Sequence, residues 1–171
     1  AFGHAALGAN TTASNNTAVG RASMQTNTTG TSNVAVGFKS LLTNTTGGNN
    51  VSLGLCSLFS NTTASDNTAI GGVALLSNTT GSDNTSVGSG SLLTNSTGAS
   101  NVAVGKDALK RNTTAAENTA IGKSALCANT TGAANTAVGL NALLDATTSA
   151  SNTAVGVEAL QNVTTGTGSN V

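Results

Sequence analysis

The most regular feature of this chain is a 17-residue pattern of polar and apolar positions that repeats from one end to the other. Each unit begins with Asn, continues with Thr or Val, then Ala or Ser, then a larger apolar residue, and reaches Gly at position 5. Position 9 is Leu or Met, and positions 12 to 14 read Asn-Thr-Thr in most copies. Because Gly recurs at this spacing from Gly3 to Gly156, the chain contains ten copies of one unit, and such a period identifies a tandem-repeat architecture.

The units predict a single repeat domain over residues 1–171, expected to be a segment cut from a longer fibre. The last copy departs from the register, since Thr167-Gly168-Ser169-Asn170 carries one extra residue. Complete coils begin at residues 16, 33, 50, 67, 84, 101, 118, 135 and 152.

The period and the residue types predict an all-β fold, a parallel β-solenoid or β-roll of ten 17-residue coils. Helical repeats are about twice as long, and Gly with Asn-Thr-Thr in most units disfavours a helix. Hairpins favour Asn-Gly or Asp-Gly turns, and neither dipeptide occurs in the sequence. Ten stacked coils separated by about 4.8 Å predict a rod roughly 48 Å long.

The strand of each coil is expected at positions 2 to 4, where side chains alternate between two faces. The larger residues at positions 2 and 4, such as Val34 and Val36, are predicted to fill the interior, with position 3 pointing the other way. Position 9 is predicted as a second interior column, and position 7, for example Val73, as a solvated corner. Position 5 is predicted as a structural corner that needs positive φ or close backbone approach. Its glycines are Gly20, Gly37, Gly54, Gly71, Gly88, Gly105, Gly122, Gly139 and Gly156.

A second apolar column follows position 9 directly and predicts contact between chains. Adjacent residues of a strand face opposite sides, so positions 9 and 10 cannot both fill one core. Three interior apolar side chains per coil also make a thin core, which predicts that chains associate along their length. The predicted interchain contact at position 10 consists of Leu42, Phe59, Leu76 and Leu93.

Positions 12 to 15 carry no charged residue in any copy, and three interpretations of this arc stay open. The first is close packing against another chain or through hydroxyl and amide ladders along the rod, in which the position-14 hydroxyls are covered or paired. The second is glycosylation of Asn-X-Ser/Thr sequons, with acceptors Asn27, Asn44, Asn61, Asn78, Asn95, Asn112 and Asn129. The third is ice binding by a Thr array, formed by Thr29, Thr46, Thr63, Thr80, Thr97, Thr114, Thr131 and Thr148.

Composition and charge narrow the function classes. Six basic and six acidic residues cancel, so the basic surface that nucleic acid requires is missing. No apolar run approaches the length of a membrane span, and we expect no membrane insertion. The single histidine, His4, has no partner at metal-ligand or catalytic spacing, so we predict no catalytic residue, cofactor or metal and no enzymatic activity. Cys56 and Cys127 lie four coils apart and are expected to be unpaired.

The repeated pentapeptides resemble known fibre proteins. Asn-Thr-Ala-Val-Gly, Asn-Thr-Ala-Ile-Gly and Asn-Val-Ala-Val-Gly resemble the head repeats of YadA-like trimeric autotransporter adhesins. With the following Ala-Leu-x-x-Asn-Thr-Thr-Gly, as at residues 125–132, the unit is more similar to repeats of phage tail-fibre proteins that carry a C-terminal chaperone. The resemblance implies a left-handed parallel β-roll assembled as a homotrimer. The adhesin repeat is usually shorter, so extra residues must bulge or widen the coil. The pentapeptides span residues 16–20, 33–37, 67–71, 101–105, 118–122, 135–139 and 152–156.

These features predict a structural protein: the shaft or head segment of an extracellular, cell-surface or virion-associated fibre that spaces and presents an adhesive tip. Its expected partner is itself, as a homotrimer or lateral filament, with a cell-surface glycan or receptor as a further partner. The alternatives are an ice-binding β-solenoid and a glycan-binding adhesin.

Overall fold

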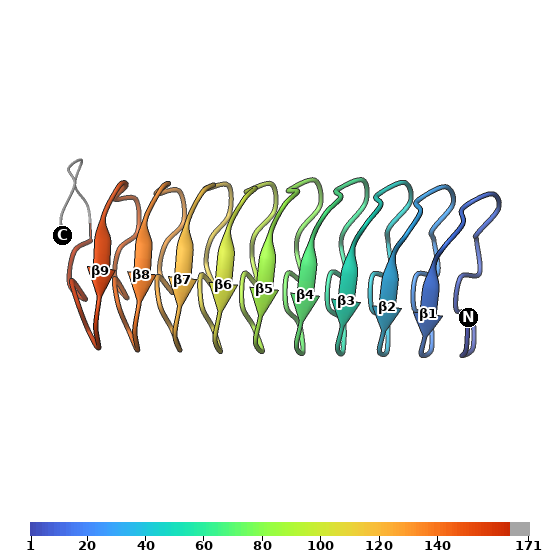
Figure 1. The fold of residues 1–171 in the computed structure, drawn as a ribbon, viewed down its shortest axis with the longest axis horizontal. Coiled ribbons are helices and arrows are strands. Elements are labelled where there is room, and N and C mark those ends of the chain that lie inside the picture. The colour runs from blue at the N-terminus through green and yellow to red at the C-terminus, as the bar shows by residue number, and fades with distance from the viewer. Residues whose placement is uncertain (165–171) are drawn as a thin grey trace.

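A computed structural model describes residues 1–164, which wind into a rod of stacked coils (Figure 1). The one-residue insertion predicted at Thr167-Gly168-Ser169-Asn170 lies outside the described residues. Each complete coil contributes one three-residue strand at positions 2 to 4. The strands are β1 (Thr17–Val19), β2 (Val34–Val36), β3 (Val51–Leu53), β4 (Thr68–Ile70), β5 (Thr85–Val87), β6 (Val102–Val104), β7 (Thr119–Ile121), β8 (Thr136–Val138) and β9 (Thr153–Val155).

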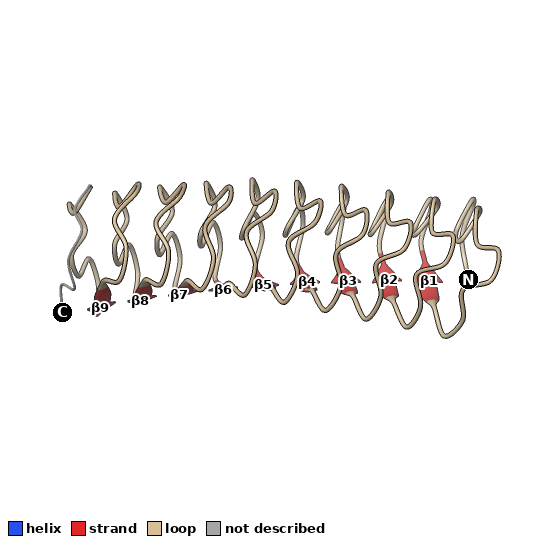
Figure 2. Ribbon diagram, turned by 90° about the horizontal axis from the view of Figure 1, so that it is seen from above, coloured by secondary structure: helices blue, strands red, loops and turns tan. Residues whose placement is uncertain are grey.

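All nine of these strands form a single parallel sheet in sequence order, from β1 to β9. Each residue pairs with the residue 17 positions later, as Thr17 does with Val34. A parallel bridge between Phe2 and Val19 extends the ladder into the incomplete first copy. The sheet lies along one side of the rod, and turns and loops make up the rest of every coil (Figure 2). The prediction of an all-β parallel solenoid with a 17-residue coil is confirmed for residues 1–164. No helix in this part of the chain has the length and hydropathy to cross a membrane.

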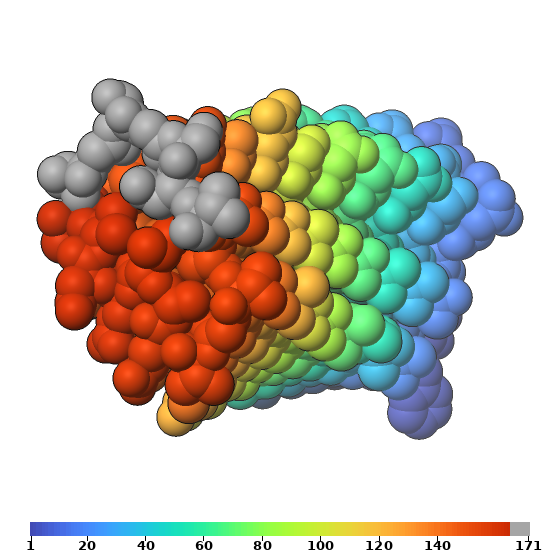
Figure 3. Space-filling view, turned by 60° about the vertical axis from the view of Figure 1, so that its left-hand side comes forward, coloured from blue at the N-terminus to red at the C-terminus, as the bar shows by residue number. Residues whose placement is uncertain are grey.

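The interior of the strand is position 3, and the prediction that positions 2 and 4 fill the core is wrong. Ala18 and Ser52 are fully buried, whereas Val36 remains 37% exposed and Val34 is half-buried. The reason is the narrowness of the coil. The Oγ atoms of Ser52 at position 3 and Ser57 at position 8 are 2.7 Å apart, so the facing walls admit only small side chains there. The larger residues at positions 2 and 4 therefore face outward, and side chains of successive coils line up in ridges along the rod (Figure 3).

Position 9 is the large-residue column of the core, as predicted. Leu76 and the other position-10 side chains, one residue later, are partly exposed, so these adjacent columns face opposite sides of the coil wall. The fully buried position-9 side chains are Met24, Leu41, Leu58, Leu75, Leu92, Leu109, Leu126 and Leu143.

Two columns of buried asparagine complete the interior. At position 1, Asn101 donates from its backbone N–H and from Nδ2 to Oδ1 of Asn84, at 3.0 and 3.1 Å. At position 12, Nδ2 of Asn95 donates to Oδ1 of Asn78 at 3.0 Å and to the carbonyl of Gly98 at 2.9 Å. Buried amides are stable only when they are hydrogen-bonded, and these ladders satisfy each amide with the next coil. The interior of residues 1–164 is therefore mixed, with buried Asn and Ser about as numerous as buried Ala, Leu and Met.

The corners of the coil depend on left-handed backbone. The position-5 glycines have φ between 124° and 144°, which confirms their predicted role. A Cβ atom on Gly105 would lie 2.5 Å from the carbonyl oxygen of Gly122 in the next coil. Positions 7, 9 and 17 also have positive φ, as in Val73 (55°), Leu75 (50°) and Asp83 (60°). Non-Gly residues are strained at positive φ, so the hydrogen-bonded ladders between coils must stabilise this backbone conformation.

Candidate functional site

The outer face of the sheet is an uncharged surface that runs along all nine strands. We define this outer sheet face as positions 2 and 4 of β1 to β9. Position 4 is always Val, Ile or Leu, position 2 is Thr or Val, and neither carries a charge. In mid-rod, Ile70 and Ile121 are 37% and 41% exposed. Contiguous exposed apolar surface of this kind is typical of interaction sites.

The position-10 column predicted for interchain contact forms a second, shorter apolar surface. Leu42, Phe59, Leu76 and Leu93 are half-buried in four successive coils. Gln25 precedes them at this position and Lys110 follows, so the column is apolar over only part of the rod.

The threonine array lies on the surface, but its hydroxyls are not engaged as the packing interpretation expected. Position 14 is exposed in every coil from Thr29 to Thr148, and these hydroxyls have no hydrogen-bond partner within the described chain. The preceding threonine behaves differently, since Oγ1 of Thr79 donates to the carbonyl of Ser96 at 3.0 Å. The predicted ladder therefore exists at positions 12 and 13, and its extension to position 14 is wrong for the single chain.

This difference predicts unequal effects of two neighbouring substitutions. Thr79→Val removes a hydrogen bond between coils and should lower the free energy of unfolding by about 1 kcal/mol. Thr80→Val removes an exposed hydroxyl without a partner and should change it by less than about 0.5 kcal/mol. Urea unfolding followed by circular dichroism measures both. An equal loss would mean that position 14 is covered in the assembled protein.

The sequon asparagines lie in the interior instead of on the surface. All seven are fully buried, from Asn27 to Asn129. The Nδ2 atom that would carry a glycan donates instead to the neighbouring coil, as Asn61 does to Oδ1 of Asn44 at 2.8 Å. A glycan there would break the ladder, so these sequons do not suit glycosylation of the folded rod.

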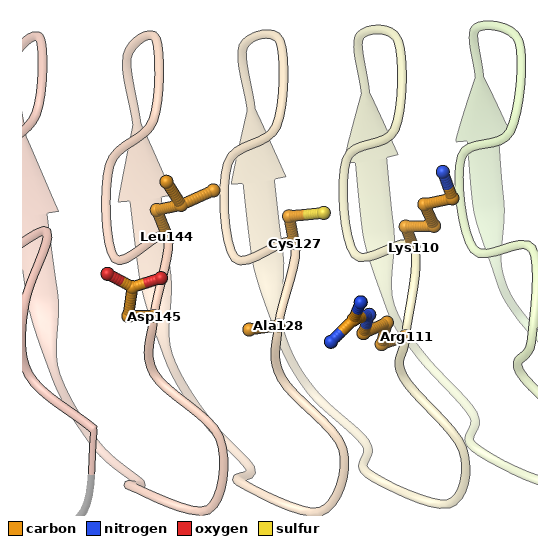
Figure 4. Close-up of a pocket in the computed structure, with 6 residues that line it drawn as sticks. All are labelled: Lys110, Arg111, Cys127, Ala128, Leu144 and Asp145. Atoms are coloured by element: carbon orange, nitrogen blue, oxygen red, sulfur yellow. The ribbon is translucent and has the colours of Figure 1, made fainter.

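A notch of about 270 Å³ interrupts the surface in the later coils (Figure 4). It forms because one coil has the small pair Cys127 and Ala128 at positions 10 and 11, between coils with larger side chains. Lys110 and Arg111 stand on one side and Asp145 on the other. Nζ of Lys110 lies 3.2 Å from a carboxylate oxygen of Asp107. The notch residues are Lys110, Arg111, Cys127, Ala128, Leu144 and Asp145.

The thiol in this notch is a poor nucleophile at neutral pH. Burial raises the pKa of Cys127, Asp107 raises it further, and Lys110 opposes the shift. The thiolate is the reactive form, so a raised pKa lowers the reactive fraction at a given pH. Cys56 and Cys127 are both free.

We therefore expect slow alkylation of Cys127 in the folded protein. In a Cys56→Ser variant at pH 8, iodoacetamide should react more slowly with the folded chain than with the chain unfolded in urea. The ratio of the unfolded-chain rate to the folded-chain rate should fall as the pH rises, because the folded thiol ionises at higher pH than the unfolded one. Mass spectrometry measures the rates, and a ratio independent of pH would mean that access alone protects the thiol.

Among residues 1–164, no three His, Cys, Asp or Glu side chains lie close enough together to hold a metal ion. His4 is exposed. The surfaces described above are suited to contact with other molecules. No known family model, curated protein or solved structure matches the chain.

Proposed function

We propose that this rod is a structural segment, shaft or head, of an extracellular or virion-associated fibre that spaces and presents an adhesive tip. In this proposal three chains, each a left-handed β-roll, associate in parallel through the outer sheet face. The observation that carries the proposal is the unbroken, uncharged column of branched aliphatic side chains at position 4, which runs along all nine strands.

The outer sheet face suits chain association better than the position-10 column. In mid-rod Ile70 and Ile121 are still more than one-third exposed, so covering each would contribute about 1 kcal/mol. The other mid-rod position-4 side chains are at least partly exposed. Because identical coils stack in one register, parallel chains can repeat the same contact at every coil. The position-10 column lacks this continuity, since Gln25 and Lys110 interrupt it.

A mechanical role also fits the way the coils are joined. Backbone ladders and the position-1 asparagines link successive coils, as Asn118 links to Asn101 at 3.0 Å. The position-12 asparagines from Asn10 to Asn129 and the position-13 hydroxyls add further links. The same links recur along the rod, so bending at any one coil must strain several hydrogen bonds together. Such a design favours a stiff spacer.

Light scattering of the purified chain tests the assembly. We expect three chains, and expect that Ile70→Lys combined with Ile121→Lys gives a monomer that keeps its β circular dichroism. A matched control, Thr80→Lys, adds charge to an exposed position outside the outer sheet face and should leave the trimer intact. A stable wild-type monomer at high concentration would overturn the assembly.

Ice binding is a second candidate, favoured by the exposed, unpaired position-14 hydroxyls. These repeat once per coil at about 4.8 Å, as a regular ice-binding array requires. Thermal hysteresis decides between the candidates. A lateral spacer gives none, whereas an ice-binding rod gives hysteresis that Thr80→Tyr with Thr97→Tyr abolishes without unfolding it.

A further inference from the structure

Four side chains from three successive coils form an aromatic and cationic cluster, the Phe38 patch, defined as Arg21, Phe38, Lys39 and Phe59. Cζ of Arg21 lies 5.9 Å from the ring centroid of Phe38. Nζ of Lys39 lies 5.3 Å from the same ring and 6.0 Å from the ring of Phe59. All three separations fall in the range of cation–π attraction, so the rings hold two long cationic side chains close together.

The cations of the Phe38 patch have no carboxylate partner in the described chain. Residues 1–65 contain Arg21 and Lys39 but no Asp or Glu, and the first acidic residue is Asp66. The one ion pair within residues 1–164 joins Lys110 to Asp107, several coils away. This part of the rod therefore presents two positive charges that no carboxylate among residues 1–164 neutralises.

Apolar surface lies beside these charges. Phe38 is 40% exposed, and Leu55, which occupies the same position 6 in the next coil, is also exposed. Positions 6, 7 and 10 do not belong to the outer sheet face, so chain association through that face would leave the patch available. Cations held by aromatic rings lose less conformational freedom on binding than free lysine and arginine side chains do.

We propose that the Phe38 patch binds a carboxylated saccharide. The carboxylate of a sugar acid would pair with Lys39 and Arg21, and the C–H surface of its ring would cover Phe38 and Leu55. Two cations are too few for nucleic acid, whose binding relies on many phosphate contacts. A peptide of Asp and Glu alone offers the charge but has no apolar ring face for Phe38 and Leu55. The inference adds lateral binding to the proposed fibre and does not depend on the trimer.

Calorimetric titration with trigalacturonate tests this binding. We expect millimolar or tighter affinity that weakens about tenfold with the methyl ester of the same trisaccharide, because the ester removes the charge. Lys39→Gln and Phe38→Ala should each weaken binding several-fold, and Phe38→Leu should keep the apolar cover but lose the cation–π contacts. The matched control is Lys123→Gln, which removes an exposed position-6 cation that has no aromatic contact.

Each other outcome overturns the inference in a distinct way. If millimolar trisaccharide gives no heat of binding, the patch does not bind a carboxylated saccharide. If Lys123→Gln weakens binding as much as Lys39→Gln, the binding reflects overall charge and not the patch. Tighter binding of tetraglutamate would assign the patch to acidic peptides. Light scattering on the same samples reports the oligomeric state separately, so failure of the binding proposal and failure of the trimer can be told apart.

Discussion

Leu75→Asp is expected to abolish cooperative folding of the rod. Leu75 is fully buried in the position-9 column, and a carboxylate there would have no cationic partner. Truncating a buried leucine alone costs about 3–5 kcal/mol, and an unpaired buried charge adds to that cost. Domains of this size are stable by about 5–15 kcal/mol, so most of the stability should be lost. Thermal unfolding followed by circular dichroism should show a broad transition at much lower temperature.

Val73→Asp is the matched control, two residues away in the same coil. Val73 is half-buried with φ of 55°, a region that suits Asp better than a β-branched residue. Asp107 and Glu158 already occupy this position in other coils. We expect unchanged or slightly raised stability. If both variants unfold alike, the orientation of positions 7 and 9 described here is wrong.

The coil, its period and its glycine corners could be predicted from the sequence because each follows from spacing. The facing of the strand could not, because alternation fixes only which residues share a face. Either positions 2 and 4 or position 3 could face the interior, and the prediction that the larger residues at positions 2 and 4 do so is wrong. The restriction of position 3 to Ala or Ser was the signal that could have corrected it, since only a narrow interior selects for such small residues.

The burial of the asparagine columns could not be predicted from the sequence for a different reason. Asn61 reads equally well as a glycan acceptor, a turn residue or a buried amide, because its sequence neighbours are the same in each case. Its role is set by Asn44 and Asn78, which lie 17 residues away on either side and complete the ladder. The sequence therefore allows an amide ladder at position 12 but does not distinguish it from a surface column of glycan acceptors.

The surface clusters could not be predicted from the sequence for another reason. Arg21, Phe38 and Phe59 occupy positions 6, 6 and 10 of three coils, and their meeting depends on how each side chain leans across the coil spacing. The notch likewise exists because Cys127 and Ala128 are smaller than the residues stacked on both sides. Spacing along the chain identifies the columns but not the contacts between them.

Gly71→Ala should be nearly as damaging as the charge in the core. Gly71 has φ of 130°, and a Cβ there would lie 2.7 Å from the carbonyl carbon of Gly88 and 2.8 Å from its oxygen. The backbone of the next coil cannot move away without breaking its own ladder. Together the unfavourable φ and the clash should cost about 3 kcal/mol or more, measured by urea unfolding.

Two control variants divide this loss between its causes. Gly72→Ala changes the next residue, where a Cβ meets nothing within 4 Å, so its stability should stay the same or rise by about 0.5 kcal/mol. Gly156→Ala keeps the strained φ, at 131°, and among residues 1–164 its Cβ has only Ala159 within 4 Å, at 3.9 Å. Its loss should therefore report backbone strain alone. The excess loss in Gly71→Ala then measures the close stacking of one coil on the next, and no excess would mean that the coils lie farther apart than the glycine column implies.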